Sequence, residues 1–196
     1  MKKLIRNLLL VLLLAVFLVP ASEADAAYYC VPWGKVYLGE PFTYFEMPDI
    51  YNQIWVSSYL RGKPVIILTA HRYQRYEVLK WAESFRQDFA ANDKAYVLWV
   101  VNLNKFPWTT SRETIVNQWR YFNPPVPMLL DWNGVIGKSL KINYNIPNII
   151  VLDAYGRLVM HEMHSYTPDV YRAVANRIRW FLPRRVGSSG KVGYSM

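Results

Sequence analysis

The sequence predicts an α/β fold with a central mixed β-sheet flanked by helices, because apolar runs of strand length alternate with stretches of helical periodicity. Residues 64–70 and 94–103 are mostly apolar and rich in β-branched side chains, which is typical of strands covered on both faces. Between these runs the apolar positions recur at spacings of four, three and four, so they share one face of a helix. These positions are Val78, Ala82, Phe85 and Phe89.

The first 26 residues have the pattern of a secretory signal peptide. Three basic residues precede the apolar segment 8–19, and residues 24–26 read Ala-Asp-Ala, an A-x-A cleavage site. The alternative is a membrane anchor, but an apolar stretch of about 12 residues is shorter than the roughly 20 that a spanning helix needs. We therefore expect cleavage, no transmembrane anchor after it, and a bacterial protein that is periplasmic or secreted.

About 170 residues remain, which is the size of a single domain. Residues 27–60 contain glycine, proline and short aromatic or β-branched runs, which predicts an N-terminal extension with a small hairpin. We expect the folded core to span residues 61–183 and a flexible basic tail to follow at 184–196.

The chain is basic, with a formal net charge of +9 that becomes +8 once the signal peptide is removed. For an exported protein, the partners compatible with this charge are an anionic envelope surface, anionic lipid headgroups or an acidic protein. We do not expect nucleic acid as a partner. A role of the charge in solubility alone is equally compatible with the sequence.

Start and stop signals place the later elements in chain order. Ser111 is a candidate N-cap for a short helix, which the proline-rich segment 124–127 ends because proline does not continue a helix. Residues 149–152 read as a core strand and 153–156 as a tight turn, with glycine available where φ is positive. The segment 157–163 then returns as the paired strand at the edge of the sheet.

A final helix is predicted to begin at residues 167–169. Their Thr-Pro-Asp sequence supplies an N-cap oxygen, a proline for the first helical position and a carboxylate that complements the helix dipole. An apolar stripe should pack this helix on the sheet; it consists of Tyr171, Val174, Ile178 and Phe181. The exposed side is basic, and a solvated face, a lipid site or a partner site would all fit its arginines: Arg172, Arg177, Arg179, Arg184 and Arg185.

Three stretches resemble the thioredoxin-like proteins of the TlpA and peroxiredoxin-related (redoxin) branch. Residues 39–49, GEPFTYFEMPD, are similar to the segment that precedes the core in that family, and Arg-Gly-Lys-Pro at 61–64 enters the first core strand as Gly-Lys-Pro does there. Residues 127–156 match the family's later pattern in register, through Pro127, Asp131, Gly134, Tyr144, Ile146, Pro147, Asp153 and Gly156. The resemblance covers roughly residues 36–182 and implies a thioredoxin-like fold.

The resemblance also implies where the family's C-x-x-C cysteines would lie, at the N-terminus of the helix after the first core strand. Tyr73 and Tyr76 occupy these two positions. The chemistry of such a motif requires a thiolate that is acidified at the helix N-terminus. A tyrosine phenol titrates near 10 and forms no disulfide, so we expect no catalytic residue, no cofactor and no conventional redox activity.

In redox relatives an extended peptide lies in a groove between this helix start and a cis-proline. By resemblance we expect His71, Arg72 and Arg75 to lie along that groove, opposite Ile146 and Pro147. The residues alone favour an ordinary trans bond before Pro147, because trans is the commoner isomer.

Few other residues in the sequence are candidates for a reactive or metal-binding site. Cys30 is the only cysteine, so it is either an incidental thiol or available for an intermolecular disulfide. His161 and His164 are three residues apart on a predicted strand and point to opposite faces, so we expect surface histidines and no metal site.

Three functions are compatible with these features. The first is a non-redox thioredoxin-fold protein of the bacterial envelope, an adaptor or chaperone-like module whose tyrosines make the groove adhesive to a protein or peptide partner. The second is the thiol-disulfide oxidoreductase or peroxidase activity that the resemblance alone implies. The third is recognition of an anion or acidic partner at the vacated site, beside the N–H groups of the helix start.

Overall fold

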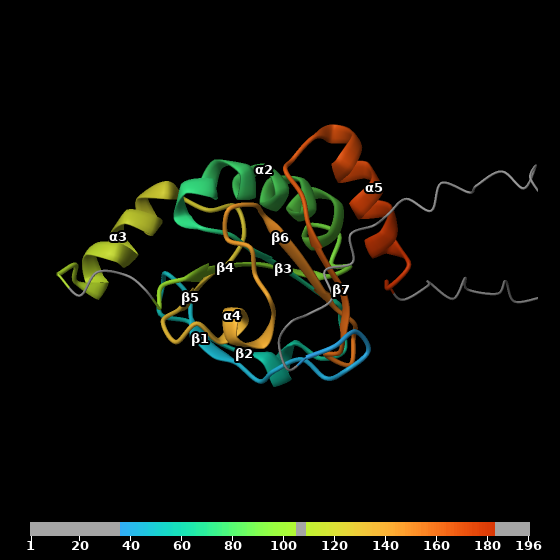
Figure 1. Ribbon diagram of the computed structural model, residues 1–196, viewed down its shortest axis with the longest axis horizontal. Helices are drawn as coiled ribbons and strands as arrows, with labels where there is room; N and C mark the ends of the chain where they lie inside the picture. Colours follow the sequence, from blue (N-terminus) through green and yellow to red (C-terminus); the bar gives the residue numbers. More distant parts are fainter. Residues whose placement is uncertain (1–35, 105–108, 183–196) are drawn as a thin grey trace, which may run out of the picture.

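The computed structural model describes residues 36–104 and 109–182. The predicted signal peptide, Cys30, the arginines at 184 and 185 and the predicted tail lie outside the described residues. The centre of the molecule is a five-stranded sheet in the order β5-β4-β3-β6-β7 (Figure 1). Its strands are β3 (Val65–Thr69), β4 (Tyr96–Asn102), β5 (Met128–Asp131), β6 (Asn148–Leu152) and β7 (Leu158–Met163).

The sheet is mixed, as the sequence predicted. β3 pairs in parallel with β4, and β4 pairs in parallel with β5. On the other side of β3, β6 is antiparallel to it, and β7 is antiparallel to β6 at the sheet edge. All five residues of β3 are buried, which explains why this segment has no polar alternation.

Helices cover both faces of the sheet. On one face lie α2 (Arg75–Phe85), α3 (Arg112–Phe122) and α5 (Pro168–Arg179), and on the other lies the short α4 (Val135–Ser139) (Figure 1). A 3-10 turn, η2 (Arg72–Gln74), leads into α2, and a π-helical turn, η3 (Arg86–Ala90), continues it. Within the described residues, no helix combines the length and the apolar character needed to span a bilayer.

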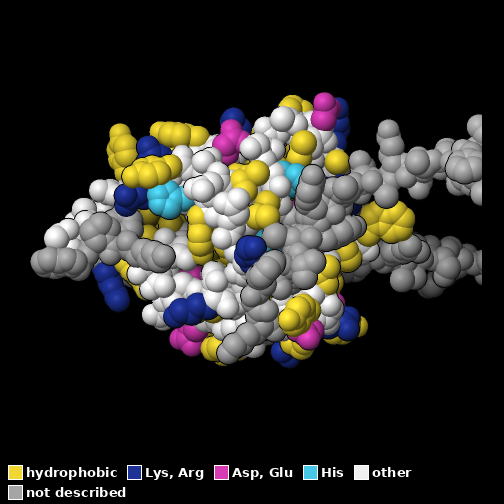
Figure 2. Space-filling model, in the orientation of Figure 1, with side chains coloured by type: hydrophobic (Ala, Val, Ile, Leu, Met, Phe, Trp, Pro, Cys, Tyr) yellow, Lys and Arg dark blue, Asp and Glu magenta, His cyan; other side chains and the backbone are white. Residues whose placement is uncertain are grey.

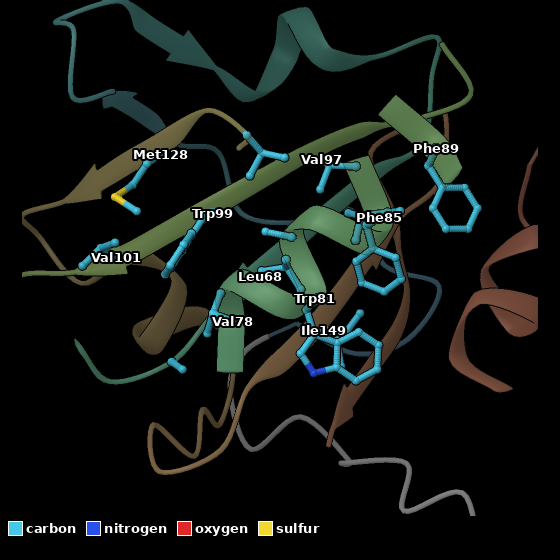
Figure 3. Close-up of a cluster of buried hydrophobic side chains, with 14 of the residues drawn as sticks. Leu68, Val78, Trp81, Phe85, Phe89, Val97, Trp99, Val101, Met128 and Ile149 are labelled. Carbon is cyan, nitrogen blue, oxygen red and sulfur yellow. The ribbon is translucent and has the colours of Figure 1, made fainter. Parts of the chain in front are cut away.

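The larger part of the core lies between α2 and the sheet. The predicted helix face is confirmed, because Val78, Ala82, Phe85 and Phe89 are all buried. Figure 3 shows the α2 side chains gathered against strand residues of the buried core. Trp81 belongs to the same group, and its ring centre lies 5.3 Å from that of Phe85. Full burial of one phenylalanine contributes about 1.5–3 kcal/mol, so this helix face alone fixes α2 on the sheet.

The predicted N-terminal hairpin is present as β1 (Glu46–Pro48) paired antiparallel with β2 (Ile54–Val56), followed by the 3-10 turn η1 (Ser57–Leu60). Asp49 organises its turn: one carboxylate oxygen accepts the N–H groups of Tyr51 at 2.8 Å and Gln53 at 2.9 Å. The other accepts the indole N–H of Trp55 at 3.1 Å. This buried acid therefore supplies the acceptors that the turn backbone needs.

The final helix begins as predicted, with the Thr167 hydroxyl accepting the N–H of Val170 at 3.2 Å. The described arginines of this helix do not form an unpaired basic surface, because each one pairs with a carboxylate. Arg172 pairs with Asp169 on the same helix, Arg179 reaches Asp88, and Arg177 binds Glu162 of β7. The exposed side of α5 is therefore largely neutralised.

The expectation of two surface histidines is wrong for His161. This side chain is only 1% exposed, and its Nε2 lies 3.1 Å from the side-chain oxygen of Asn148. Burial lowers the pKa of His161 to about 4, so the ring is neutral near pH 7. His164 is half-buried and bonds to Glu162 at 2.9 Å. The described residues include no group of three or more histidine, cysteine or acidic side chains that could hold a metal ion.

Candidate functional site

The candidate site forms where β3 ends and the chain turns into α2. His71 has extended backbone geometry (φ −67°, ψ 148°), and its Nδ1 accepts the N–H of Tyr73 at 3.4 Å. The carbonyl of His71 accepts the N–H of Gln74 at 2.8 Å. His71 thus caps the helical segment at the place where the sequence predicted a helix start.

Tyr73 and Tyr76 both point into solvent, with 74% and 59% of their surface exposed. An arginine lies over each ring: Arg72 is 5.1 Å from the centre of Tyr73, and Arg75 is 4.9 Å from the centre of Tyr76. Each guanidinium also donates to its tyrosine hydroxyl, at 3.2 Å and 3.3 Å respectively. The helix start therefore presents two matching arginine–tyrosine pairs, which cation–π contact stabilises by about 0.5–1 kcal/mol each at exposed positions.

These pairs form one wall of a groove of about 960 Å³ whose other wall is α3. Figure 2 shows hydrophobic and basic side chains, with a histidine beside them, gathered over the end of α2 nearest α3. The ring of Tyr76 meets that of Phe122 at 5.9 Å in an edge-on contact. The groove is lined by Arg72, Tyr73, Arg75, Tyr76, Thr114, Asn117, Gln118, Trp119, Tyr121 and Phe122.

The α3 wall rests on the core. Trp119 packs edge-on against Trp99 of β4 at 6.0 Å, and Phe122 does the same at 5.7 Å. The hydroxyl of Ser111 caps the start of α3 by accepting the N–H of Thr114 at 3.1 Å, as the sequence predicted. At the other end Asn123 adopts a left-handed conformation with φ 50°, which stops the helix before the prolines. The α3 wall is thus held in place before any ligand arrives.

Four of the lining residues, the two arginines and the two tyrosines, are among those that the sequence singled out. The contribution of α3 was not predicted, because that helix is distant in sequence and no local pattern links Trp119 or Phe122 to the turn. A usable signal was present: the aromatic residues of α3 extend beyond the single stripe that packing on a sheet requires.

The other predicted site residues, His71, Ile146 and Pro147, are not among the described residues that line the groove. His71 lies beside it, with its ring centre 4.6 Å from that of Tyr73. The loop that carries Ile146 and Pro147 instead contacts the turn through one hydrogen bond, from the N–H of His71 to the carbonyl of Tyr144 at 2.7 Å. The described chain contains no cis peptide bond, so Pro147 is trans, the isomer of lower free energy, and the cis form implied by the resemblance is not adopted.

No protein-family model matches this sequence, and no curated protein matches it. Solved structures do match. The exposed lipoprotein thioredoxin Etrx1 of Streptococcus pneumoniae is 18% identical with a TM-score of 0.55, over 70% of this chain and 99% of that protein. A candidate protein disulfide isomerase from Bacteroides thetaiotaomicron is 16% identical with a TM-score of 0.57, over 76% of this chain and 91% of that one.

The chain has a thioredoxin-like fold. The thioredoxin domain of a thiol-disulfide oxidoreductase from Bacteroides vulgatus gives the same result, with 16% identity and a TM-score of 0.52 over 73% of this chain and 99% of that domain. Identities at this level establish the architecture and leave function to the site itself. At the start of α2 this chain carries Tyr73 and Tyr76. Because its sequence has one cysteine, the chain cannot form an internal disulfide.

Proposed function

We propose that this chain is a non-redox binding protein that uses a thioredoxin-like fold to hold an extended peptide segment. The observation that carries the proposal is the groove between the start of α2 and α3, which is open and aromatic and whose described lining residues include no cysteine. Tyr73 and Tyr76 take the positions that the family resemblance gives to the reactive cysteines. Without those cysteines these positions could still bind a peptide, although they could not exchange disulfides with it.

Aromatic side chains suit this role because they offer large contact area at a low cost in conformational entropy. Trp119 and Phe122 meet each other edge-on, with ring planes at 87°, and both contact Trp99 in the core. A surface that is already ordered loses little entropy on binding. The exposed tyrosines on the opposite wall can then close over an apolar side chain of the bound peptide.

The polar residues of the α3 wall match a peptide backbone. Asn117 and Gln118 each carry both donors and an acceptor, and Thr114 carries a hydroxyl. An extended chain presents unpaired N–H and C=O groups along its length, so these side chains can bond to it independently of its sequence. The expected partner is therefore a flexible or unfolded segment of another protein.

The proposed setting is the bacterial envelope, where the protein would act as an adaptor, assembly factor or chaperone-like module. The signal-peptide pattern of residues 1–26 supports export. The match to a protein that is named as an exposed lipoprotein is consistent with the same setting.

Thiol-disulfide exchange is the competing function, since the names of the structural neighbours describe such enzymes. Exchange within one protein needs a dithiol, and the sequence supplies a single cysteine far from the turn in sequence. Purified protein should therefore fail to reduce insulin, and a Cys30→Ser variant should behave identically. Steady insulin reduction by the unmodified protein would favour the enzyme instead.

Binding can be tested with the insulin B chain whose cysteines have been blocked by iodoacetamide, labelled with fluorescein and followed by anisotropy. Truncating a contact ring costs about 1–2 kcal/mol, so Tyr73→Ala and Tyr76→Ala should each raise Kd about five- to thirtyfold. Unchanged affinity in both variants would remove the groove from the proposal.

Tyr155→Ala is a matched control. Tyr155 and Tyr73 are both 74% exposed. An arginine lies 5.1 Å from the ring centre of each, Arg157 for Tyr155 and Arg72 for Tyr73. Tyr155 follows the far end of β6, outside the groove. Its truncation should leave Kd unchanged, so a loss equal to that of Tyr73→Ala would indicate nonspecific adhesion to exposed rings.

A further inference from the structure

We infer that the groove selects acidic peptide segments, in which carboxylates flank an aromatic side chain. This inference rests on the proposed function and adds the chemistry of the partner. It follows from the charges along the groove, from the way in which its arginines are held, and from the arrangement of its aromatic rings.

Among the described residues, the groove is lined by two arginines and by no aspartate or glutamate. Two acids adjoin lining residues in sequence, Glu77 next to Tyr76 and Glu113 next to Thr114, and neither lines the groove. Glu77 is committed to other partners: it pairs with Lys80 at 2.7 Å and accepts the N–H of Tyr166 at 2.9 Å. The pKa of Glu77 is lowered, first by its bond to Lys80, which accords with that commitment. A bound carboxylate would thus face the Arg75 guanidinium without a competing acid among the described residues that line the groove.

Arg75 differs from those arginines of the described chain that pair with carboxylates. Arg86, Arg157, Arg172, Arg177 and Arg179 each pair with a carboxylate. Arg75 has no carboxylate partner among residues 36–104 and 109–182, and is held by aromatic rings instead, with Tyr76 at 4.9 Å and Phe122 at 6.0 Å. A guanidinium has five N–H donors, and the bond to the Tyr76 hydroxyl uses one of them. The edge of Arg75 can therefore still take a carboxylate through two parallel hydrogen bonds.

Stacking prepares Arg75 for this contact. An arginine side chain loses considerable rotamer entropy when it is fixed in place, which weakens contacts made by mobile arginines. Here the contact with Tyr76 and Phe122 restricts the guanidinium before the ligand arrives. The same rings lie beside the place where the peptide's aromatic side chain would enter, so charge and shape would be recognised together.

The ring arrangement favours a peptide over an acidic glycan. Trp119 and Phe122 cross at 87°, and Tyr76 meets Phe122 at 65°, so these rings form an angular cleft and not a flat platform. An angular cleft accepts an inserted side chain edge-on, whereas a sugar ring stacks best on a flat aromatic face. An acidic glycan is therefore an alternative that the experiment must separate.

The test compares two synthetic peptides by isothermal titration on the mature protein. One has glutamate on both sides of a phenylalanine, and the other has glutamine at the same places. We expect the acidic peptide to bind about tenfold more tightly at low salt, with the difference shrinking as sodium chloride is added. In Arg75→Gln the two peptides should bind within about twofold of each other, while residual aromatic binding remains.

Arg172→Gln is the matched control, because it removes the same charge from an exposed arginine of α5 that pairs with Asp169 and lies outside the groove. It should keep the preference for the acidic peptide. Equal binding of both peptides by the unmodified protein would overturn this inference and leave the proposed function standing. Binding of polygalacturonate with no binding of either peptide would overturn both.

Discussion

The N–H of His71 donates to the carbonyl of Tyr144 at 2.7 Å, and this bond joins the turn before α2 to the loop that leads into Pro147. Tyr144 is itself fixed at its other end, where its hydroxyl accepts the side-chain amide of Asn102. Burial raises the pKa of the Tyr144 phenol, so this hydroxyl stays neutral at any physiological pH. The helix start is thus linked to β4 through one tyrosine.

Gly137 makes room for that tyrosine. A Cβ at this position would lie 2.4 Å from the Tyr144 hydroxyl, which is held by Asn102 and cannot easily move. Gly137→Ala gains about 1 kcal/mol in helix propensity but overpacks the site at a cost of about 1–3 kcal/mol. We expect a net loss of about 1 kcal/mol in the free energy of unfolding by urea, and Tyr144→Phe in the same chain should recover part of it. A Gly137→Ala variant more stable than the parent would contradict this packing.

His161 should make stability depend on pH. Its pKa is about 4 in the folded protein against 6.5 as the ordinary value, because burial disfavours the charged ring. The unfolded chain therefore binds the proton first as the pH falls, so stability is full above about pH 6.5 and is lost progressively toward pH 4. The loss is about 3 kcal/mol for a shift of this size. Urea titrations across this range should show the slope, and His161→Gln should flatten it; an equal slope in the variant would contradict the assignment.

Arg177 and Arg172 lie on the same helix but should contribute unequally. Arg177 donates to both oxygens of Glu162 at 2.7 and 2.6 Å, and Glu162 is only 1% exposed. Although burial raises the pKa of Glu162, its bonds to His164 and Arg177 outweigh that effect and lower it. Arg177→Gln leaves a buried carboxylate short of partners and should cost about 2–4 kcal/mol in thermal or urea unfolding. Arg172→Gln removes an exposed pair and should cost less than about 0.5 kcal/mol. Equal losses of stability in the two variants would show that the buried pair contributes no more than the exposed one.

A designed reversal tests whether Tyr73 and Tyr76 occupy the thiol positions. In a Cys30→Ser background, Tyr73→Cys with Tyr76→Cys places two thiols one helical turn apart at the capped start of the segment. The helix N-terminus and the neighbouring arginines both stabilise a thiolate, so the first cysteine should be markedly more acidic than a free thiol. We expect a reversible disulfide and weak insulin reduction. Two cysteines that stay unpaired under mild oxidant in a folded protein would show that the alignment of this turn is wrong.

Local patterns predicted most of the fold. The uninterrupted apolar run of β3, the helical spacing from Val78 to Phe89 and the Thr167 cap are each set by residues close in sequence, so they could be read without a structure. Only part of the candidate site could be predicted from the sequence. Arg75 and Tyr76 belong to the turn, but their contact with Phe122 depends on how α3 lies against β4, which no local pattern determines.

Two other features required the tertiary structure. His161 has the polar character of a surface residue, yet β7 places it inside the sheet beside Asn148. The isomer of Pro147 likewise depends on the surrounding contacts, because the free-energy difference between cis and trans X-Pro bonds is only about 0.5–1 kcal/mol.

The binding site is tested most directly by mapping where the alkylated insulin B chain binds, using backbone amide chemical shifts of the protein without residues 1–26, labelled with ¹⁵N. We expect concentration-dependent shifts that cluster in residues 72–76 and 114–122, while the turn at 153–156 remains unchanged. Shifts that cluster away from the start of α2 and from α3, or no shifts at saturating peptide, would contradict the claim that this groove is the binding site.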